Sequence, residues 1–145
     1  MNNSFVNVVQ KCICIDFLLN ALINFNPYEY LKSLISMKDE NLKNIKVICQ
    51  MYESIYKDKL VLEDVPNIKL NKNYENCLNT LLEYNLSLIT ELEFLKHNPS
   101  NHNHYKFLQN LISSYFNSIS LINCLYATRL PNTSLFIDNN NIFLI

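Results

Sequence analysis

The chain has no glycine, and this absence removes several classes of function. Its 145 residues contain neither glycine nor tryptophan, whereas average usage of about 7% would give roughly ten glycines. Phosphate-binding P-loops, the dinucleotide fingerprint and the serine nucleophile elbow each need a backbone conformation that glycine alone tolerates. Enzymes built on these three motifs are therefore excluded.

Charge is also scarce. Charged residues make up 17% of the chain, and 12 basic against 13 acidic side chains give a formal net charge of −1. Nucleic-acid binding needs a basic surface that displaces counterions, which this balance does not supply. The apolar N-terminal stretch is interrupted by Asp16, Asn20 and Asn24 and has no basic residues before it, so it does not resemble a secretory signal. No run reaches the ~18 apolar residues of a membrane helix, and we expect a cytoplasmic protein that binds neither nucleic acid nor membrane.

What the chain has in quantity is hydrophobic residues, at 49% of the total. Apolar residues recur at spacings of three and four in four stretches, which predicts four amphipathic helices. The first ends near Asn26, and Asn26 with Pro27 and Glu29 is a typical start signal for the second. The third runs from about Asn73 to Leu95, and the segment around Pro99 breaks it. The fourth runs from Tyr105 to the break at Leu130-Pro131, and its predicted apolar face consists of Tyr105, Leu108, Ile112, Tyr115, Ile119, Ile122 and Tyr126.

The second helix has the least regular pattern. It is weakest over 36–41, which predicts that the helix is interrupted there or begins late. Its predicted buried face consists of Leu31, Leu34, Leu42, Ile45, Cys49, Tyr52 and Tyr56. The five cysteines lie mostly among apolar neighbours, which suits reduced thiols in a core better than disulfides.

These helices predict an all-α fold in one domain over residues 1–145. Short links make the first and second helices, and the third and fourth, antiparallel neighbours. The connection after the second helix, about fourteen residues at up to ~3.3 Å each, can run the length of a four-helix bundle. The order predicts a bundle with a long crossover between its second and third helices.

Several segments resemble a ferritin subunit, in order and in spacing. Leu62-Glu63-Asp64-Val65 is similar to the family's Leu-Gln-Asp-Ile after the second helix, and the 74–79 segment is similar to its Trp-Glu-Ser-Gly-Leu-Asn. The third helix carries Leu-Glu-Tyr-Asn at 82–85 where the family has Leu-Glu-Lys-Asn, and the stretch from Phe107 to Leu130 matches the fourth helix without a gap. The resemblance implies a ferritin-like bundle, a short fifth helix over Leu135–Ile145 and assembly with like subunits into a shell that stores ferric iron.

Most of the family's iron chemistry does not transfer to this sequence. An oxidising ferritin subunit holds two irons with one glutamate on helix 1, a Glu-x-x-His pair on helix 2 and one glutamate on helix 3. The pair falls here on Leu42 and Ile45, and the helix 1 position lies near Cys14, with Asp16 the nearest carboxylate. Glu83 alone is retained, so the resemblance implies no ferroxidase activity.

The closest description is a light-type subunit, which lacks the oxidation centre. Such subunits carry cavity-facing glutamates on helix 2, where this chain retains Asp39 and Glu40. Glu40 and Glu83 are therefore the candidate iron-contacting residues. The carboxylates of the iron channel fall on Lys106 and Gln109, and a lysine ring repels Fe²⁺.

The alternative is a non-catalytic interaction or adaptor protein. Nine tyrosines with few charges provide amphipathic aromatic surface for a partner. His97, His102 and His104 cluster before the fourth helix but lack a nearby cysteine or carboxylate in that loop, which favours a solvated turn over a metal site. Asn85 lies on the apolar face of the third helix, where a buried asparagine can fix the register of helix packing.

Overall fold

The computed structural model describes residues 3–25, 28–62, 68 and 73–128, and in these ranges it contains helices and no strand. The four long helices are α1 (Asn3–Asn24), α2 (Leu31–Tyr56), α3 (Tyr74–His97) and α4 (Tyr105–Thr128). Two short 3₁₀ helices, η1 (Tyr28–Tyr30) and η2 (Pro99–His104), precede α2 and α4. The predicted all-α class and the existence of four long helices are confirmed.

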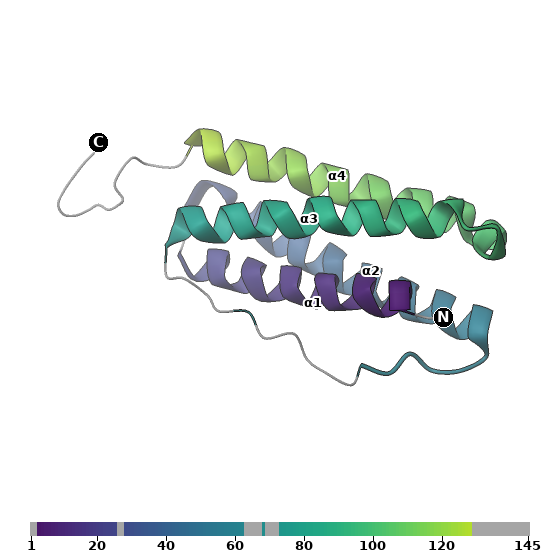
Figure 1. Cartoon of the computed structure of the whole chain (residues 1–145). Helices are drawn as coiled ribbons and strands as arrows, with labels where there is room; N and C mark the ends of the chain where they lie inside the picture. Colours follow the sequence, from purple (N-terminus) through teal and green to yellow (C-terminus); the bar gives the residue numbers. More distant parts are fainter. Residues whose placement is uncertain (1–2, 26–27, 63–67, 69–72, 129–145) are drawn as a thin grey trace.

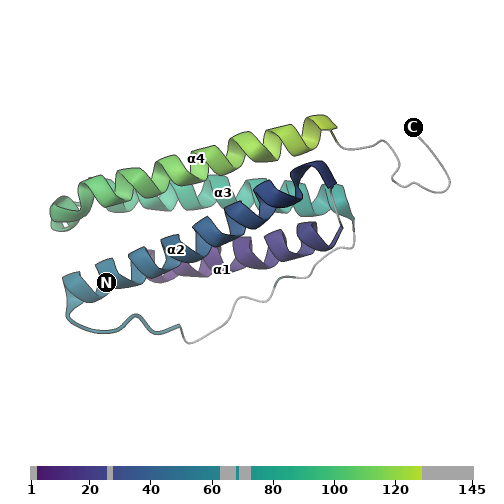
Figure 2. The same ribbon diagram turned by 180° about the vertical axis from the view of Figure 1, so that it is seen from behind.

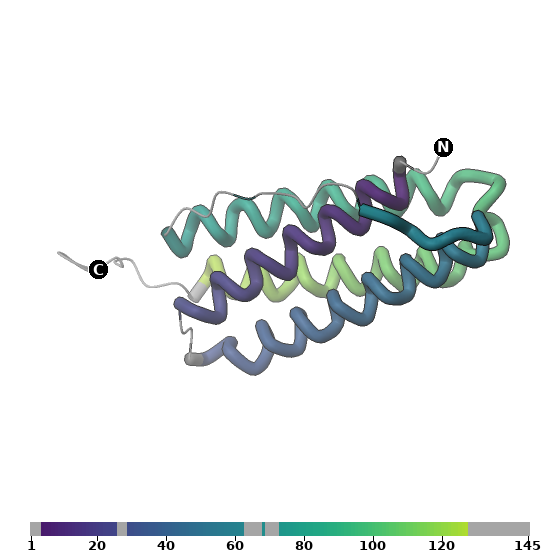
Figure 3. Tube along the Cα trace, turned by 90° about the horizontal axis from the view of Figure 1, so that it is seen from below, coloured from purple at the N-terminus to yellow at the C-terminus, as the bar shows by residue number. Residues whose placement is uncertain are grey.

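The helices lie side by side, with α1 and α4 running in one direction and α2 and α3 in the other (Figures 1 and 2). α1 packs against both α2 and α3, and α3 packs against α1 and α4, whereas α2 and α4 make few contacts. The tube view shows α2 and α3 both ending at the end of the molecule where α1 starts (Figure 3). The chain between Tyr56 and Tyr74 therefore has to return along the molecule, a distance of about 36 Å for a helix of α3's length.

The start of α3 follows from its capping residue. The side chain of Asn73 accepts hydrogen bonds from the backbone N–H groups of Glu75 (2.8 Å) and Asn76 (3.2 Å), which are unsatisfied at a helix start. Glu75 in the first turn and the basic pair Lys96 and His97 in the last turn complement the helix dipole. The predicted start near Asn73 is confirmed.

The break between α3 and α4 also has a local cause. The Asn98 side chain accepts from the backbone N–H of Ser100 at 3.0 Å, and Pro99 cannot continue a helical hydrogen-bond ladder. Asn101 is buried and donates from its side chain to the Leu95 carbonyl at 2.9 Å. This bond holds η2 against the end of α3.

The end of α2 shows how the chain manages without glycine. Lys57 adopts a left-handed conformation with φ of 56°, and its N–H bonds to the Glu53 carbonyl at 2.9 Å. This position after a helix is most often glycine, because a Cβ disfavours positive φ. Lys57 is the one residue with positive φ among those the structure describes.

The core is built from the inward faces of all four helices. Its fully buried large side chains are Phe5, Ile15, Leu18, Leu19, Leu22, Leu34, Ile48, Leu78, Leu81, Leu88, Leu92 and Tyr115. Leu60, Leu62 and Ile68, from the connection between α2 and α3, are partly buried against this core.

α1 is long and apolar enough to cross a membrane, judged by its length and composition alone. The buried core helix of a globular protein meets the same criterion.

Two predictions for the second helix are wrong. α2 is continuous across 36–41, although its first turn is 3₁₀ and it becomes α-helical only at Leu31. Leu42 (41% exposed) and Tyr56 (37% exposed) lie outside the core, while Asn41 and Asn44 are buried in their place. The predicted face of α2 contained only apolar residues and tyrosines. The face that is buried is rotated by about one residue toward the N-terminus and includes the two asparagines.

The prediction for Tyr105 is wrong, and the prediction that the cysteines lie in the core is confirmed in part. Tyr105, assigned to the apolar face of the fourth helix, is 46% exposed. Cys12, Cys14 and Cys77 are buried as expected and Cys49 is half-buried, but Cys124 is exposed. The start signal at Asn26-Pro27 and the fifth helix over Leu135–Ile145 lie outside the described residues.

Two leucines on α3 give a matched test of the core. Leu88 is fully buried, so we expect Leu88→Ala to lower the free energy of unfolding by about 2–5 kcal/mol through lost burial and the remaining cavity. Leu86→Ala removes the same atoms from a side chain that is 49% exposed and should change stability by less than about 0.5 kcal/mol. Urea denaturation followed by circular dichroism measures both, and equal losses would contradict the packing described.

Candidate functional site

A set of polar side chains, four of them buried, lies where α1, α2 and α4 meet near the middle of the helices. We call it the polar cluster, and it consists of Cys12, Glu40, Asn41, Asn44, Ser114 and Tyr115. Cys12, Asn41 and Tyr115 are each at most 2% exposed. Burying polar groups is unfavourable unless each finds a hydrogen-bond partner, so the arrangement of these bonds decides what the cluster can do.

The inner part of the polar cluster is a closed triangle of bonds. The Tyr115 hydroxyl donates to Oδ1 of Asn41 at 2.6 Å, and Nδ2 of Asn41 donates to the Cys12 carbonyl at 2.8 Å. The Cys12 sulfur lies 3.3 Å from the Tyr115 oxygen. Because the single hydroxyl proton is used toward Asn41, the thiol is the donor in this contact. Three helices are thus joined by two bonds between side chains and one bond from a side chain to a backbone carbonyl.

The outer part leads from this triangle to the surface. Asn44 donates from Nδ2 to the Ser114 hydroxyl at 3.0 Å, and Ser114 donates to a carboxylate oxygen of Glu40 at 3.4 Å. Glu40 is exposed. The polar cluster therefore runs from a charged group at the solvent edge to neutral groups in the core.

Burial keeps the two acidic groups of the triangle protonated. It raises the pKa of the Cys12 thiol from 9.0 to about 12, because the thiolate would lose its hydration in the core. Burial also raises the pKa of the Tyr115 hydroxyl well above its usual value, and the neighbouring Cys12 adds to this effect. A protonated thiol is a poor nucleophile and a poor metal ligand, so the Cys12 side chain is not activated for either role at neutral pH.

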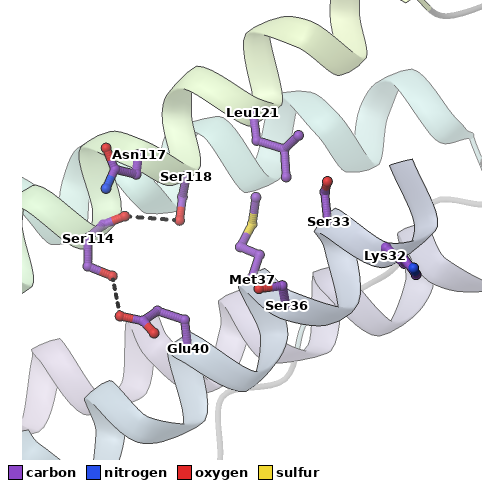
Figure 4. Close-up of a pocket in the computed structure, with 9 residues that line it drawn as sticks. All are labelled: Lys32, Ser33, Ser36, Met37, Glu40, Ser114, Asn117, Ser118 and Leu121. Carbon is purple, nitrogen blue, oxygen red and sulfur yellow. Dashed lines mark hydrogen bonds between the residues drawn. The ribbon is translucent and has the colours of Figure 1, made fainter. Parts of the chain in front are cut away.

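The solvent edge of the polar cluster opens into a groove between α2 and α4 (Figure 4). This serine groove has a volume of about 500 Å³. It exists because α2 and α4 approach each other less closely than the other neighbouring helices. Its lining residues are Lys32, Ser33, Ser36, Met37, Glu40, Ser114, Asn117, Ser118 and Leu121.

The pair of residues that faces inward on α2 differs from the pair that the resemblance matched to Glu-x-x-His. Resemblance placed the Glu-x-x-His positions on Leu42 and Ile45, but Leu42 is 41% exposed and Ile45 is only partly buried. The pair that points inward at spacing i, i+3 is Asn41 and Asn44, one residue earlier. This inward pair cannot replace the metal ligands of Glu-x-x-His, because it offers two carboxamides in place of a carboxylate and an imidazole.

The donor set of the polar cluster does not fit a di-iron centre. Such a centre needs several anionic oxygen donors and histidine nitrogens around each metal. Here two carboxamides, a protonated thiol and a neutral phenol surround the centre, and the single carboxylate, that of Glu40, lies at the solvent edge. Within the described ranges no three His, Cys, Asp or Glu residues are grouped so that they could hold a metal ion.

The two candidate iron-contacting residues lie apart. Glu40 lies in the serine groove of α2 and α4, whereas Glu83 is an exposed residue of α3, a helix that does not line this groove. Cys14 is buried against α3, where its side chain bonds to that of Tyr84, and Asp16 forms an ion pair of 2.8 Å with Lys38. Neither Cys14 nor Asp16 joins the polar cluster.

The remaining candidates also lie away from the polar cluster. His97 is largely exposed and lies 3.5 Å from Glu93, and His102 is exposed on η2. Asn85 is completely buried as predicted; its Nδ2 donates to the Leu81 carbonyl at 2.8 Å, and its Oδ1 has no partner among the described residues. The register role assigned to Asn85 stays a prediction.

Sequence reasoning missed most of the polar cluster. It placed Tyr115 on the apolar face of the fourth helix and Cys12 in the core, but it did not include Asn41 and Asn44 in the buried face of the second helix. The available signal was their i, i+3 spacing next to the buried Met37 and Ile48.

Comparison with known proteins adds no further assignment, since no family model, curated protein or solved structure matches the chain.

Removal of one hydroxyl tests the triangle. Tyr115→Phe leaves Oδ1 of Asn41 buried without its donor, and we expect the free energy of unfolding to fall by about 1–3 kcal/mol. The matched control is Tyr105→Phe, because the Tyr105 side chain is 46% exposed and keeps its ring over Lys96. Chemical denaturation measures both variants, and a Tyr115→Phe variant as stable as the control would contradict the bonded triangle.

The raised pKa of Cys12 predicts a loss of stability in alkali. Above pH 9 the thiol of the unfolded chain loses its proton, while the folded chain keeps that proton up to a pKa of about 12. The folded state then binds more protons, so the free energy of unfolding falls as pH rises through this window. Cys12→Ala should fall less steeply than the wild type, and Cys124→Ala, which removes an exposed thiol, should keep the wild-type slope. Chemical denaturation at a series of pH values measures these slopes, and equal slopes for the wild type and Cys12→Ala would contradict the raised pKa of Cys12.

Proposed function

We propose that this chain is a non-oxidising, structural subunit of a ferritin-like assembly that stores ferric iron. The observation that carries the proposal is the neutral triangle of side chains at the inner end of the polar cluster. A ferritin-like oxidising subunit would need anionic ligands there, and this chain has a self-satisfied triangle of Cys12, Asn41 and Tyr115. Its role in such an assembly is to form part of the shell.

The order of the helices supports the ferritin-like part of the proposal. α2 and α3 run in the same direction, so a long return connects them, as in a four-helix bundle with one crossover. α1 contacts both α2 and α3, and α4 contacts α3. The segments that resemble ferritin lie in the connection, at the start of α3 and along α4.

Iron contact in this proposal falls to surface carboxylates. Glu40 in the serine groove and Glu83 on α3 are exposed, and carboxylate oxygen is a hard donor that suits ferric iron. These residues contact the stored mineral as cargo, and a partner subunit that oxidises Fe²⁺ supplies the ferric form. The partners are further copies of this chain or ferritin-like subunits with an oxidation centre.

An adaptor function is the second candidate, and the exposed aromatic residues favour it. Phe17, Phe94, Phe107 and Phe116 are 49%, 62%, 57% and 52% exposed. Large exposed aromatic side chains often mark surfaces that other proteins cover. A subunit of a shell covers such surfaces with neighbouring subunits, whereas an adaptor covers them with a different protein.

Iron assays test the proposal through a pair of carboxylates. The chain alone should oxidise Fe²⁺ no faster than buffer, since its buried centre lacks anionic ligands. Offered ferric iron, it should retain iron in a gel-filtration fraction, and Glu40→Gln with Glu83→Gln should lower retention roughly twofold or more. Glu29→Gln, which neutralises an exposed carboxylate on η1, is the matched control and should retain as much as the wild type.

The outcomes separate the two candidate functions. Oxidation faster than buffer would contradict a non-oxidising subunit. A chain that retains no iron, alone or mixed with an oxidising ferritin subunit, and that does not exceed the mass of a dimer would contradict storage and favour the adaptor. Iron assays and light scattering on the same fractions provide these readouts.

A further inference from the structure

α2 carries a second regular pattern on the side that faces away from the core. This α2 stripe is exposed except at the half-buried Cys49, and its apolar members Ile35 and Leu42 are 44% and 41% exposed. Viewed from behind, α2 lies in front of α1, with α4 above it (Figure 2). The residues of the α2 stripe are Lys32, Ile35, Asp39, Leu42, Lys46, Cys49 and Glu53.

The α2 stripe consists of two columns with a period of seven. Ile35, Leu42 and Cys49 form an apolar column, and the column beside it is charged, with signs that alternate along the helix in the order Lys32, Asp39, Lys46, Glu53. The two columns interleave at spacings of three and four, so they share one face of the helix. Where helices pair, charges beside an apolar column at heptad spacing set the choice of partner and its orientation.

The four charges of this column have no ion-pair partner among the described residues. Other charged side chains do find one, as in the pairs Lys38–Asp16 and Lys11–Glu91. The charged column is therefore free to pair with another molecule. Its alternating sign determines which orientation of a partner helix it accepts.

An antiparallel second copy matches the column at every position. The midpoint between Asp39 and Lys46 coincides with the midpoint between Lys32 and Glu53, next to Leu42. A two-fold axis at this point brings Asp39 opposite the partner's Lys46, and Lys32 opposite the partner's Glu53, with both contacts repeated by symmetry. The same axis brings Leu42 against its own copy and Ile35 against the partner's Cys49. In a parallel pairing each charge would instead face its own copy.

We propose that a second copy of this chain docks on the α2 stripe, antiparallel and related by a two-fold axis beside Leu42. The central contacts tolerate a range of crossing angles, because Asp39 and Lys46 each lie only about 5 Å along the helix from the axis. Lys32 and Glu53 lie about 16 Å from it and contribute where the helices cross at a shallow angle. The contact does not rest on iron storage; in a larger assembly it is one of the two-fold contacts.

Charge reversal at the central pair tests the orientation as well as the contact. The wild type should approach about 34 kDa, twice the 17.1 kDa of one chain, in a concentration series from low micromolar to near millimolar. Asp39→Lys and Lys46→Asp each turn both central contacts into like-charge pairs and should weaken association roughly tenfold or more. Asp39→Lys with Lys46→Asp in one chain should restore it, because both contacts are opposite in sign again.

A mixture of the two single variants gives the sharpest readout. Asp39→Lys has two central lysines and Lys46→Asp has two central aspartates, so the two should associate with each other more tightly than either does with itself. Lys106→Glu, an exposed charge reversal on α4, is the control and should associate as the wild type does. Sedimentation equilibrium measures the masses, and circular dichroism confirms that each variant is folded.

Each outcome bears on the proposal. A monomeric wild type over the whole series would overturn it, and so would association that both single reversals leave unchanged. Loss in the single variants without recovery in the double variant or in the mixture would overturn the antiparallel pairing. If a larger particle forms, the same reversals should lower its mass, and their failure to do so would also overturn the proposal. None of these readouts involves iron, so they are independent of the storage assays.

Discussion

The hydrogen bonds between α2 and α4 hold together the side of the molecule where packing is weakest. α1 contacts α2 and α3 extensively, and α3 contacts α4 extensively, so three of the four sides are closed by apolar side chains. On the fourth side the serine groove separates the helices, and contact is made by Asn41 with Tyr115 and by Asn44 with Ser114. These bonds are directional, so they fix how α2 and α4 are aligned along their axes more strictly than apolar packing would.

The same bonds limit the chemistry available at the centre of the molecule. The buried thiol, phenol and carboxamide are neutral and use their polar atoms in hydrogen bonds within the triangle. They therefore provide no anionic ligand for a cation. Burial shifts the pKa of both acidic groups in the direction that keeps them neutral. A proposal that assigns this chain a structural role and leaves iron contact to surface carboxylates is consistent with both properties.

Much of the fold could be predicted from the sequence, because its signals are local. The 3–4 spacing of leucine and isoleucine predicted all four long helices, and single residues such as Asn73 and Pro99 marked where helices begin or end. The buried face of α2 could not be predicted in the same way. The partners that make Asn41 a core residue are Cys12 and Tyr115, which lie 29 positions before it and 74 positions after it. A pattern read along one helix scores asparagine as a surface residue, and only the assembled helices supply its hydrogen bonds.

The weak contact between α2 and α4 has a consequence for motion. α3 has closely packed neighbours on two sides, whereas α2 has one such neighbour, α1, and is otherwise joined to α4 by a few polar side chains next to an open groove. Regions with fewer buried apolar contacts open at lower free energy than the core does. By the same criterion α4 has one closely packed long neighbour, α3. Amide protons of α2 and α4 thus exchange with solvent through local opening, while those of α1 and α3 exchange mainly when the whole chain unfolds.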